Sequence, residues 1–402
     1  MVEPHVVVVG ASLAGLQAAV TLRADGFAGA VTLVGAEPHR PYDRPPLSKQ
    51  VLAGEWDADR VALPAGAGDA LDVTWELGVA AAGLDLEARR LALGDGRELA
   101  FDGLVVATGA APRSLPGTGA LTGVHTLRTL EDALAVRAAL EAGASRVVVV
   151  GAGFIGAEVA ASCRGRGAAV TLVEPLPQPL ARVLPEEVGA VLADVHRQHG
   201  VDVRLGVGVE ALEGRGSVTG VRLADGSSVA ADLVVVGIGV VPSTGWLDGS
   251  GLVLDDGVVC DETTLAAPGV VAAGDAARWP NPRYGELMRV EHWEHAIDMG
   301  AHAARRLVAH LRGEPGEAFA PVPWFWSDQY DRKIQLAGRP RPTDRFEVVA
   351  GSLAEGRFCG LFGRDGQVVA ALGINMAGRV VRYRRQLHDG LGWDDALAAA
   401  TP

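Results

Sequence analysis

The sequence predicts an α/β fold made of two similar β-α-β units, followed by a smaller α+β region at the C-terminal end. The first observation is a near-repeat, in which VVVVGASLAGLQAAVTL begins at Val6 and VVVVGAGFIGAEVAASC begins at Val147. Each Val run leads into a Gly-rich turn, an Ala-rich helical stretch and a second Val-rich strand. The second observation is a change of character at Pro321, where a Trp-rich segment introduces alternating strand-like runs. A repeat of about 140 residues is too long for a solenoid and indicates domain duplication.

The composition is that of a large globular protein. With 402 residues, of which 49% are hydrophobic and 21% charged, the chain can form two or three domains. Its net charge of -13 disfavours non-specific binding to nucleic acid or anionic membranes. The uncharged run from Val6 to Leu22 has no basic leader and is interrupted by glycines, so we expect neither a signal peptide nor a membrane anchor. We therefore expect the protein to be cytoplasmic.

The cysteines do not indicate a metal or redox site. Cys163, Cys260 and Cys359 lie far apart and form no CxxC or CxxxxC pair. We therefore expect neither a zinc site nor a local dithiol, and interpret all three as buried thiols of ordinary reactivity.

The second unit satisfies each requirement of a Rossmann-like dinucleotide site. Gly151, Gly153 and Gly156 occupy the turn, and Glu174 follows 18 positions after the last of them. Such glycines let the backbone approach a pyrophosphate at a helix N-terminus, and the acid binds ribose hydroxyls. A 2′-phosphate would be repelled by Glu174, and residues 175–181 contain neither Lys nor Arg. The unit is therefore predicted to bind NADH in preference to NADPH.

The first unit departs from this pattern at one position. Ser12 stands where the middle glycine is expected, between Gly10 and Gly15, and it is small enough to allow a close approach. Glu37 follows Gly15 by 22 positions, but Ala36 precedes it, so the residue that faces the ribose stays open by one position. We predict a second dinucleotide site here.

Two further strands are expected to close the two sheets. Leu99–Val106 runs into Ala107-Thr108-Gly109, and Ala230–Val236 runs into Gly237-Ile238-Gly239. After Gly269 the string VVAAGDAA has the same design. Because the second unit closes near Val240, this later strand is expected to return to the first sheet.

These observations predict three domains. The first is discontinuous and comprises residues 1–112 and 247–320, the second comprises 113–246, and the α+β domain comprises 321–402. A helix is expected over 294–311. In the last domain we expect strands at 333–337, 346–351, 357–364 and 367–374, then helices around 377–391 and 393–400.

Seven strings in order carry a specific resemblance to a known family. They are RPYDRPPLSK at 40–49, ATG at 107–109, LRTLEDA at 127–133, GAGFIGAE at 151–158, GIGVVPST at 237–244, AAGDAA at 272–277 and PWFWSDQ at 323–329. Together they resemble the ferredoxin reductases of bacterial oxygenase systems over essentially the whole chain. The resemblance implies FAD in the first domain, NADH in the second, and electron transfer to an iron–sulfur ferredoxin that feeds a monooxygenase or dioxygenase.

The resemblance and the Gly-rich turns together name the cofactor-binding residues. For FAD they are Gly10, Ser12, Ala14, Gly15, Glu37, Lys49, Val79, Ala107, Gly109, Arg128, Asp275 and Trp293. For NADH they are Gly151, Gly153, Ile155, Gly156, Glu158, Glu174 and Gly239.

Three residues are expected to act in the reaction itself. By resemblance, Lys49 lies near the reactive edge of the flavin, where its charge would favour an anionic reduced flavin, and Glu158 pairs with it and holds the nicotinamide carboxamide. By the same resemblance, Trp326 is expected to lie over the flavin, as a gate that the nicotinamide must displace or near the route by which the electrons leave. The alternatives are a solvated loop charge for Lys49 and an exposed helix carboxylate for Glu158. Arg128 could instead pair with Glu131.

Other residues near these strings are given a structural interpretation. His292 and His295 are expected to pack or cap a helix, and Trp324 and Trp293 could fill an interface. Hydride transfer depends on positioning more than on acid–base catalysis, so neither histidine needs a catalytic role.

The electrons are expected to leave the protein. The related disulfide reductases keep a cysteine pair beside the flavin, and the corresponding string PPLSKQVL has none. A ferredoxin would need a cationic surface on this acidic protein. The candidates are Arg379, Arg382, Arg384 and Arg385, with Arg305 and Arg306 on the preceding helix. The alternative for these arginines is that they are solvated residues on helix faces. The alternatives for the function are an NADH-sensing or scaffolding flavoprotein, and a reductase whose acceptor is rubredoxin or a quinone.

Overall fold

The structure is a computed structural model, and it describes residues 3–63 and 71–400. The chain forms two compact units, each built from three segments. Unit 1 comprises Met1–Asp43, Val61–Ala111 and Val241–Pro323, and unit 2 comprises Arg44–Arg60, Pro112–Val240 and Trp324–Pro402. The segment Arg44–Arg60 thus groups with unit 2, which the sequence did not predict. The three domain boundaries inferred from the sequence stay a prediction.

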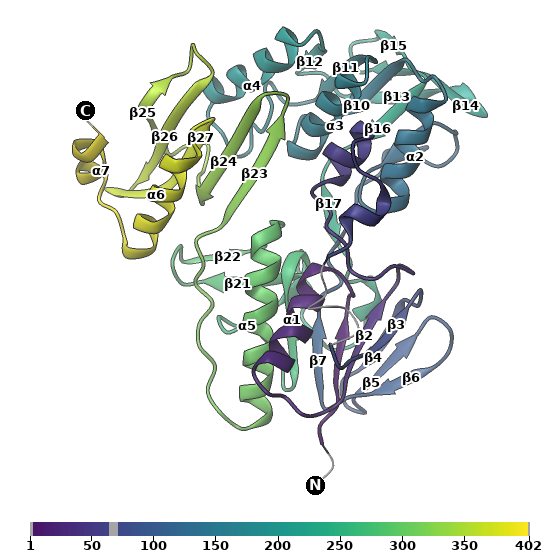
Figure 1. The fold of residues 1–402 in the computed structure, drawn as a ribbon, viewed down its shortest axis with the longest axis vertical. Helices are drawn as coiled ribbons and strands as arrows, with labels where there is room; N and C mark the ends of the chain where they lie inside the picture. The colour runs from purple at the N-terminus through teal and green to yellow at the C-terminus, as the bar shows by residue number, and fades with distance from the viewer. Residues whose placement is uncertain (1–2, 64–70, 401–402) are drawn as a thin grey trace. The chain divides into compact units, whose positions relative to one another are not determined.

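Unit 1 is centred on a six-stranded sheet in the order β19-β20-β7-β1-β2-β3. Figure 1 labels β7, β2 and β3 of this sheet. Its strands are β1 (Val6–Val9), β2 (Val31–Gly35), β3 (Thr74–Leu77), β7 (Gly103–Val106), β19 (Leu265–Ala267) and β20 (Val270–Ala272). All neighbours are parallel except β19 and β20. Because β20 pairs with β7, the late strand returns to the first sheet as expected. The Val-rich strands are buried throughout, as in parallel sheets that are covered on both faces.

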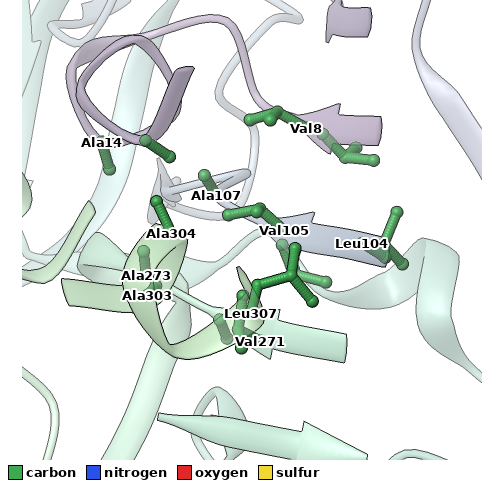
Figure 2. Close-up of a cluster of buried hydrophobic side chains, with 14 of the residues drawn as sticks. Val8, Ala14, Leu104, Val105, Ala107, Val271, Ala273, Ala303, Ala304 and Leu307 are labelled. Atoms are coloured by element: carbon green, nitrogen blue, oxygen red, sulfur yellow. The ribbon is translucent and has the colours of Figure 1, made fainter. Parts of the chain in front are cut away.

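Two helices pack together against this sheet. They are α1 (Leu13–Ala24) and α5 (Trp293–Leu311). Figure 2 shows Ala14 of α1 next to Ala304 of α5, Ala303 beside Ala273, and Leu307 between Val105 and Val271. A Cβ on Gly300 would overlap the carbonyl oxygen of Ala14. The small residues on both helices therefore permit their close approach, and α5 supplies the apolar cover of the sheet.

Smaller elements complete unit 1. A three-stranded sheet contains β4 (Ala81–Asp85), β5 (Arg90–Leu93) and β6 (Glu98–Ala100). Another contains β18 (Val258–Val259), β21 (Ala277–Asn281) and β22 (Glu286–Met288).

Unit 2 contains a second parallel sheet in the order β12-β11-β10-β16-β9. Its strands are β9 (Val124–Thr126), β10 (Arg146–Val150), β11 (Ala169–Glu174), β12 (Asp202–Leu205) and β16 (Leu233–Val236). The helices are α2 (Leu130–Glu141), α3 (Phe154–Gly165) and α4 (Glu186–Gln198). An antiparallel sheet of β13 (Val209–Arg215), β14 (Ser217–Leu223) and β15 (Ser228–Ala230) follows β12. The two parallel sheets confirm the Rossmann-like α/β fold.

Two strands expected to be continuous are each broken, which corrects the sequence-based expectation. Leu99–Val106 divides between β6 and β7, and Ala230–Val236 divides between β15 and β16. An aspartate stands at each break. Asp102 accepts the backbone N–H of His5 at 2.7 Å, and Asp232 accepts that of Arg146 at 3.0 Å. Each aspartate therefore binds the start of the central Val strand, and the regular pairing of the preceding strand ends there.

The C-terminal region is an antiparallel sheet in the order β23-β24-β27-β26-β25. Its strands are β23 (Trp324–Gln329), β24 (Arg332–Gly338), β25 (Arg345–Ser352), β26 (Arg357–Arg364) and β27 (Gln367–Ile374). Helix α6 (Ala377–Asp389) packs against β24 and β27, and α7 (Trp393–Ala400) follows it (Figure 1). These elements confirm the four strands and two helices expected there.

The three thiols are buried, as expected from the sequence. All three cysteines are free and buried, and burial raises the pKa of each thiol to about 12. Among residues 3–63 and 71–400, no helix combines the length and the apolar character needed to cross a membrane.

His295 is packed entirely inside unit 1. Its ring stacks on Trp279 at 4.9 Å between centroids and contacts Phe319 at 5.6 Å. Burial lowers the pKa of His295 to about 3, so the ring is neutral near pH 7. The packing role expected for this histidine is confirmed. His292 occupies the N-cap position of α5 without a side-chain cap bond.

The buried histidine should make unit 1 sensitive to acid. The pKa of this histidine is near 6.5 in the unfolded chain and about 3 in the folded protein, so between these values only the unfolded chain binds a proton. The free energy of unfolding therefore decreases as the pH falls from 6.5 toward 3. We expect His295 to account for about 2 kcal/mol of lost unfolding free energy at pH 5. His295→Phe should flatten this dependence in urea unfolding at pH 7 and pH 5. An unchanged slope would contradict the assignment.

Candidate functional site

The same backbone contact closes the Gly-rich turn in both units. Gly10 follows β1 with φ of +116°, and Gly151 follows β10 with φ of +101°. A Cβ on Gly10 would overlap the carbonyl oxygen of Ala107, and one on Gly151 would overlap that of Gly237. Glycine is therefore required by conformation and by space, because the turn presses against the end of the neighbouring strand.

The helices that follow these turns begin without acidic residues or side-chain caps. In the described residues of α1 and α3, the first turn holds no Asp or Glu, and Ser12 and Gly153 make no N-cap side-chain bond. Helices α2 and α4, by contrast, carry acidic residues in their first turns. A Cβ at Gly153 would meet nothing within 4 Å, so the space in front of α3 is open. Both N-termini therefore fit an anionic pyrophosphate.

The acid predicted for the NADH ribose lies against the turn of unit 2. Glu174, which ends β11, accepts the N–H of Ala152 at 2.8 Å and the N–H of Leu176 at 3.0 Å. It is 9% exposed. The two backbone bonds fix the carboxylate beside the Gly-rich turn and leave its remaining lone pairs for ribose hydroxyls.

The corresponding position in unit 1 is a glycine. Gly10 donates its N–H to Val34, as Gly151 does to Val173, so Gly35 is the counterpart of Glu174. A Cβ on Gly35 would press on Ala11, so no acid fits there. Glu37 stands two residues later, half-buried, and accepts a hydrogen bond from the hydroxyl of Tyr42. Ala36 is exposed, which leaves Glu37 as the carboxylate beyond this strand end.

The remaining predicted residues of unit 1 gather at one edge of its sheet. Val79 follows β3, Ala107 and Gly109 follow β7, and Asp275 follows β20. Because these strands are parallel to β1, all of these residues lie with Gly10 at the carboxyl edge, where ligands bind in such sheets. Trp293 joins them from the start of α5 and donates its indole N–H to Asp43 at 2.6 Å. Sequence reasoning missed Asp43, although it lies within the family string RPYDRPPLSK.

Unit 2 shows the same arrangement for its own sheet. Gly151 follows β10, Gly239 follows β16, and Arg128 follows β9. Arg128 donates its main-chain N–H to Asp132, and its carbonyl accepts from the Arg44 guanidinium at 2.6 Å. Ile155 is 48% exposed at the start of α3, an unusual setting for a large apolar side chain.

The predicted pairing of Lys49 with Glu158 is present in unit 2. The ammonium lies 2.8 Å from Oε2 of Glu158, and the side chains are 13% and 3% exposed. Lys49 lies on a π-helical turn, η1 (Leu47–Val51), and Glu158 lies in the second turn of α3. The alternatives of a solvated loop charge and an exposed helix carboxylate are therefore wrong. Segment 44–60 joins unit 2 partly through this buried ion pair.

Sequence reasoning missed two hydroxyls on the same carboxylate. Ser48 donates to Oε2 of Glu158 at 2.5 Å, and Ser327 of β23 donates to Oε1 at 2.8 Å. Both serines lie in strings quoted for the family resemblance, but only the fold brings them together. The ion pair and the hydrogen bonds on both oxygens offset the desolvation penalty of burying this carboxylate.

The aromatic residues of β23 alternate across the strand. Trp324 and Trp326 lie on one face, 5.4 Å apart, whereas Phe325 contacts Phe154 at 4.4 Å. Phe154 begins α3, next to the open space at Gly153. The gate role of Trp326 stays a prediction.

The arginines of α6 divide between solvent and the sheet. Arg379, Arg382 and Arg385 are exposed, whereas the Arg384 guanidinium lies over the Trp324 ring at 5.4 Å. In unit 1, Arg305 pairs with Asp25 at 2.8 Å, and Arg306 donates to the Thr263 hydroxyl. We call Arg379, Arg382 and Arg385 the α6 basic face.

Two family models match the chain in succession. Residues 4–300 match the pyridine nucleotide-disulphide oxidoreductase family, and residues 324–401 match the reductase C-terminal domain. Rhodocoxin reductase of Rhodococcus erythropolis is 42% identical over 88% of this chain and 82% of its own length. The 5,5'-dehydrodivanillate O-demethylase ferredoxin reductase subunit of a Sphingobium species is 41% identical over 99% of this chain and 97% of its own.

The fold also matches a solved complex. The covalent putidaredoxin reductase–putidaredoxin structure superimposes with a TM-score of 0.91 at 35% identity, covering 97% of this chain and 94% of the other. The chain therefore belongs to the pyridine nucleotide-disulphide oxidoreductase family, in its group of ferredoxin reductases of bacterial oxygenase systems.

Proposed function

We propose that this protein oxidises NADH with a bound FAD and passes the electrons singly to an iron–sulfur ferredoxin that serves an oxygenase. The balanced reaction converts one NADH and two oxidised ferredoxins into NAD⁺, one proton and two reduced ferredoxins. The observation that carries this proposal is the duplicated dinucleotide turn in a chain whose thiols are all buried and protonated. The three cysteines are all free, so the chain offers no disulfide that could take up the electrons, and the acceptor would be external.

The residues of unit 1 fit FAD, and those of unit 2 fit NADH. The N-terminus of α1 would hold the FAD pyrophosphate and Glu37 its ribose, while α3 and Glu174 would do the same for NADH. A bound flavin supplies the chemistry that accepts a hydride and releases single electrons. The residues of this protein would hold the nicotinamide and the flavin in the orientation for hydride transfer and would exclude water.

The Lys49–Glu158 pair would orient the nicotinamide. Glu158 keeps free lone pairs that can accept from a carboxamide, and Lys49 brings a positive charge into a largely buried site. Neither group has to transfer a proton for the hydride to move. Trp326 would cover the flavin until the nicotinamide takes its place.

The function is tested most directly by coupled turnover. The FAD-loaded enzyme, NADH and a panel of ferredoxins should reduce cytochrome c at rates that depend on the ferredoxin. Rapid flavin reduction without turnover on any ferredoxin would favour another acceptor, such as rubredoxin or a quinone. Slow reduction with a long-lived charge-transfer complex would instead favour an NADH sensor.

We also propose that the protein works in the cytoplasm. Its three cysteines are unpaired, as is usual for proteins of reducing compartments.

Removing the charge of Glu158 should slow hydride transfer. Glu158→Gln keeps the shape of the side chain but leaves Lys49 without its partner, so the nicotinamide and the ammonium both lose their fixed geometry. We expect stopped-flow flavin reduction by NADH to slow by about ten- to a hundredfold at saturating NADH. FAD content should be retained. A rate within twofold of the wild type would refute this role.

Coenzyme preference should depend on the charge of Glu174. Glu174→Gln keeps an acceptor for the Ala152 N–H but removes the repulsion of a 2′-phosphate. The ratio of kcat/KM for NADH to that for NADPH should fall by about tenfold. Asp202→Asn, which removes a charge from the opposite end of the neighbouring strand β12, is the control and should leave the ratio unchanged.

The α6 basic face should guide ferredoxin docking. The double variant Arg382→Glu/Arg385→Glu should raise the apparent KM for ferredoxin by about tenfold at low salt, because steering depends on charge. NADH–ferricyanide activity should not change. Arg215→Glu, an exposed arginine at the end of β13, serves as the control. Equal loss of both activities would argue against docking at α6.

A further inference from the structure

A chain of hydrogen-bonded side chains extends from Glu158 through the interior of unit 2. Ser327 donates to Glu158 Oε1 at 2.8 Å, and Gln329 Nε2 donates to the Ser327 hydroxyl at 3.2 Å. Beyond it, His196 Nε2 lies 3.2 Å from Gln329 Oε1, and His196 Nδ1 lies 3.0 Å from the Tyr330 hydroxyl. Ser327, Gln329 and His196 are each no more than 1% exposed.

All four hydrogen bonds can run in the same direction, with each donor on the side away from Glu158. The Gln329 amide nitrogen is engaged by Ser327, so its oxygen faces His196, and His196 must donate from Nε2. The Nδ1 atom is then the acceptor for Tyr330. Burial lowers the pKa of His196 to about 4, which agrees with a neutral ring carrying one N–H. Four donors in sequence therefore point toward one carboxylate oxygen, and each bond polarises the next.

The chain does not have the chemistry of a proton conduit. A proton wire needs groups that gain and lose protons readily, and the amide of Gln329 does neither under ordinary conditions. The amide is instead a rigid spacer whose two ends fix the rotamers of its neighbours. This leaves orientation of the carboxylate as the work that the chain can do.

The outer end of the chain is held by a strained residue. Tyr330 begins the two-residue turn between β23 and β24 with φ of +54°, in the left-handed region that favours glycine and strains a tyrosine. Its ring stacks on His199 at 3.7 Å between centroids, with the ring planes within 9° of parallel. A glycine would suit this backbone, but it would provide neither the stack nor the hydroxyl. The strain therefore indicates that the side chain is needed.

We propose that Ser327, Gln329, His196 and Tyr330 are positioning residues that fix Glu158 in the orientation required for hydride transfer. The inference rests on the proposed role of Glu158 toward NADH. These four residues act through Glu158 and touch neither reacting group. This series of hydrogen bonds links α4 and the C-terminal strand β23 to the carboxylate on α3.

A double-mutant cycle separates positioning from general destabilisation. In the FAD-loaded enzyme, Ser327→Ala and Gln329→Leu should each slow flavin reduction by NADH about tenfold. In a Glu158→Gln background, Ser327→Ala should change the rate less than twofold, because the group that it positions has already been altered. If Ser327→Ala slowed the reaction by the same factor in the Glu158→Gln background as in the wild type, the proposal would be overturned.

A second readout reports the orientation of Glu158 without catalysis. Lys49 is shielded by its ion pair, so release of Glu158 should accelerate acetylation of Lys49, followed by mass spectrometry, at least threefold in Ser327→Ala and Gln329→Leu. Unchanged labelling in both variants would also overturn the proposal. If Glu158→Gln leaves flavin reduction intact, the proposed role of Glu158 fails, and the labelling result alone decides whether the chain positions the carboxylate.

Two further variants guard against misfolding. Gln178→Leu removes a comparable buried amide, whose Nε2 donates to the Leu184 carbonyl at 3.0 Å, and should alter neither readout. Tyr330→Phe deletes only a hydroxyl at the half-buried end of the chain and keeps the stack on His199. If Ser327→Ala does not fold, Tyr330→Phe takes its place in the double-mutant cycle with Glu158→Gln. A wild-type reduction rate and wild-type labelling in Tyr330→Phe would then count against the proposal.

Discussion

The two sheets depend on one repeated backbone contact, the turn after the first strand pressed against the end of a neighbouring strand. In unit 1 the contact joins Gly10 to Ala107, and in unit 2 it joins Gly151 to Gly237. It brings the helix N-terminus to the carboxyl edge of the sheet, where the residues that follow the other parallel strands also gather. A side chain at either glycine would separate the strands, so the proposed nucleotide sites and the packing of the sheets rest on the same two positions.

Much of this arrangement could be predicted from the sequence, because it follows from local patterns. The Val runs and the Gly-rich turns are adjacent in sequence, and Glu174 ends the next strand of the same β-α-β unit, so one short stretch of sequence encodes contacts that are also close in space. The broken strands at Asp102 and Asp232 were not foreseen, since a single aspartate in an apolar run does not reveal which distant N–H group it binds. The shift of the acid from Gly35 to Glu37 depends on the backbone bonds that make Gly35 the counterpart of Glu174, and these bonds are not visible in a local pattern.

The surroundings of Glu158 were the least predictable part of the site. Its pairing with Lys49 was expected from the family resemblance, but Ser48 and Ser327 lie 110 and 169 residues away from it. Contacts of this range depend on how η1 and β23 dock on α3, which no local pattern encodes. A buried carboxylate must find several donors, and that requirement is the physical reason to search for such partners.

The bond from Ser327 to Glu158 has a consequence for recombination between relatives. The segment that matches the reductase C-terminal domain begins at residue 324, so β23 would pass to a chimera with the C-terminal part while Glu158 and His196 stayed with the other parent. A graft lacking the serine or the glutamine would leave a buried carboxylate short of a donor. The two parts are therefore expected to be interchangeable only between parents that share this hydrogen-bond pattern, even where their surfaces and folds agree.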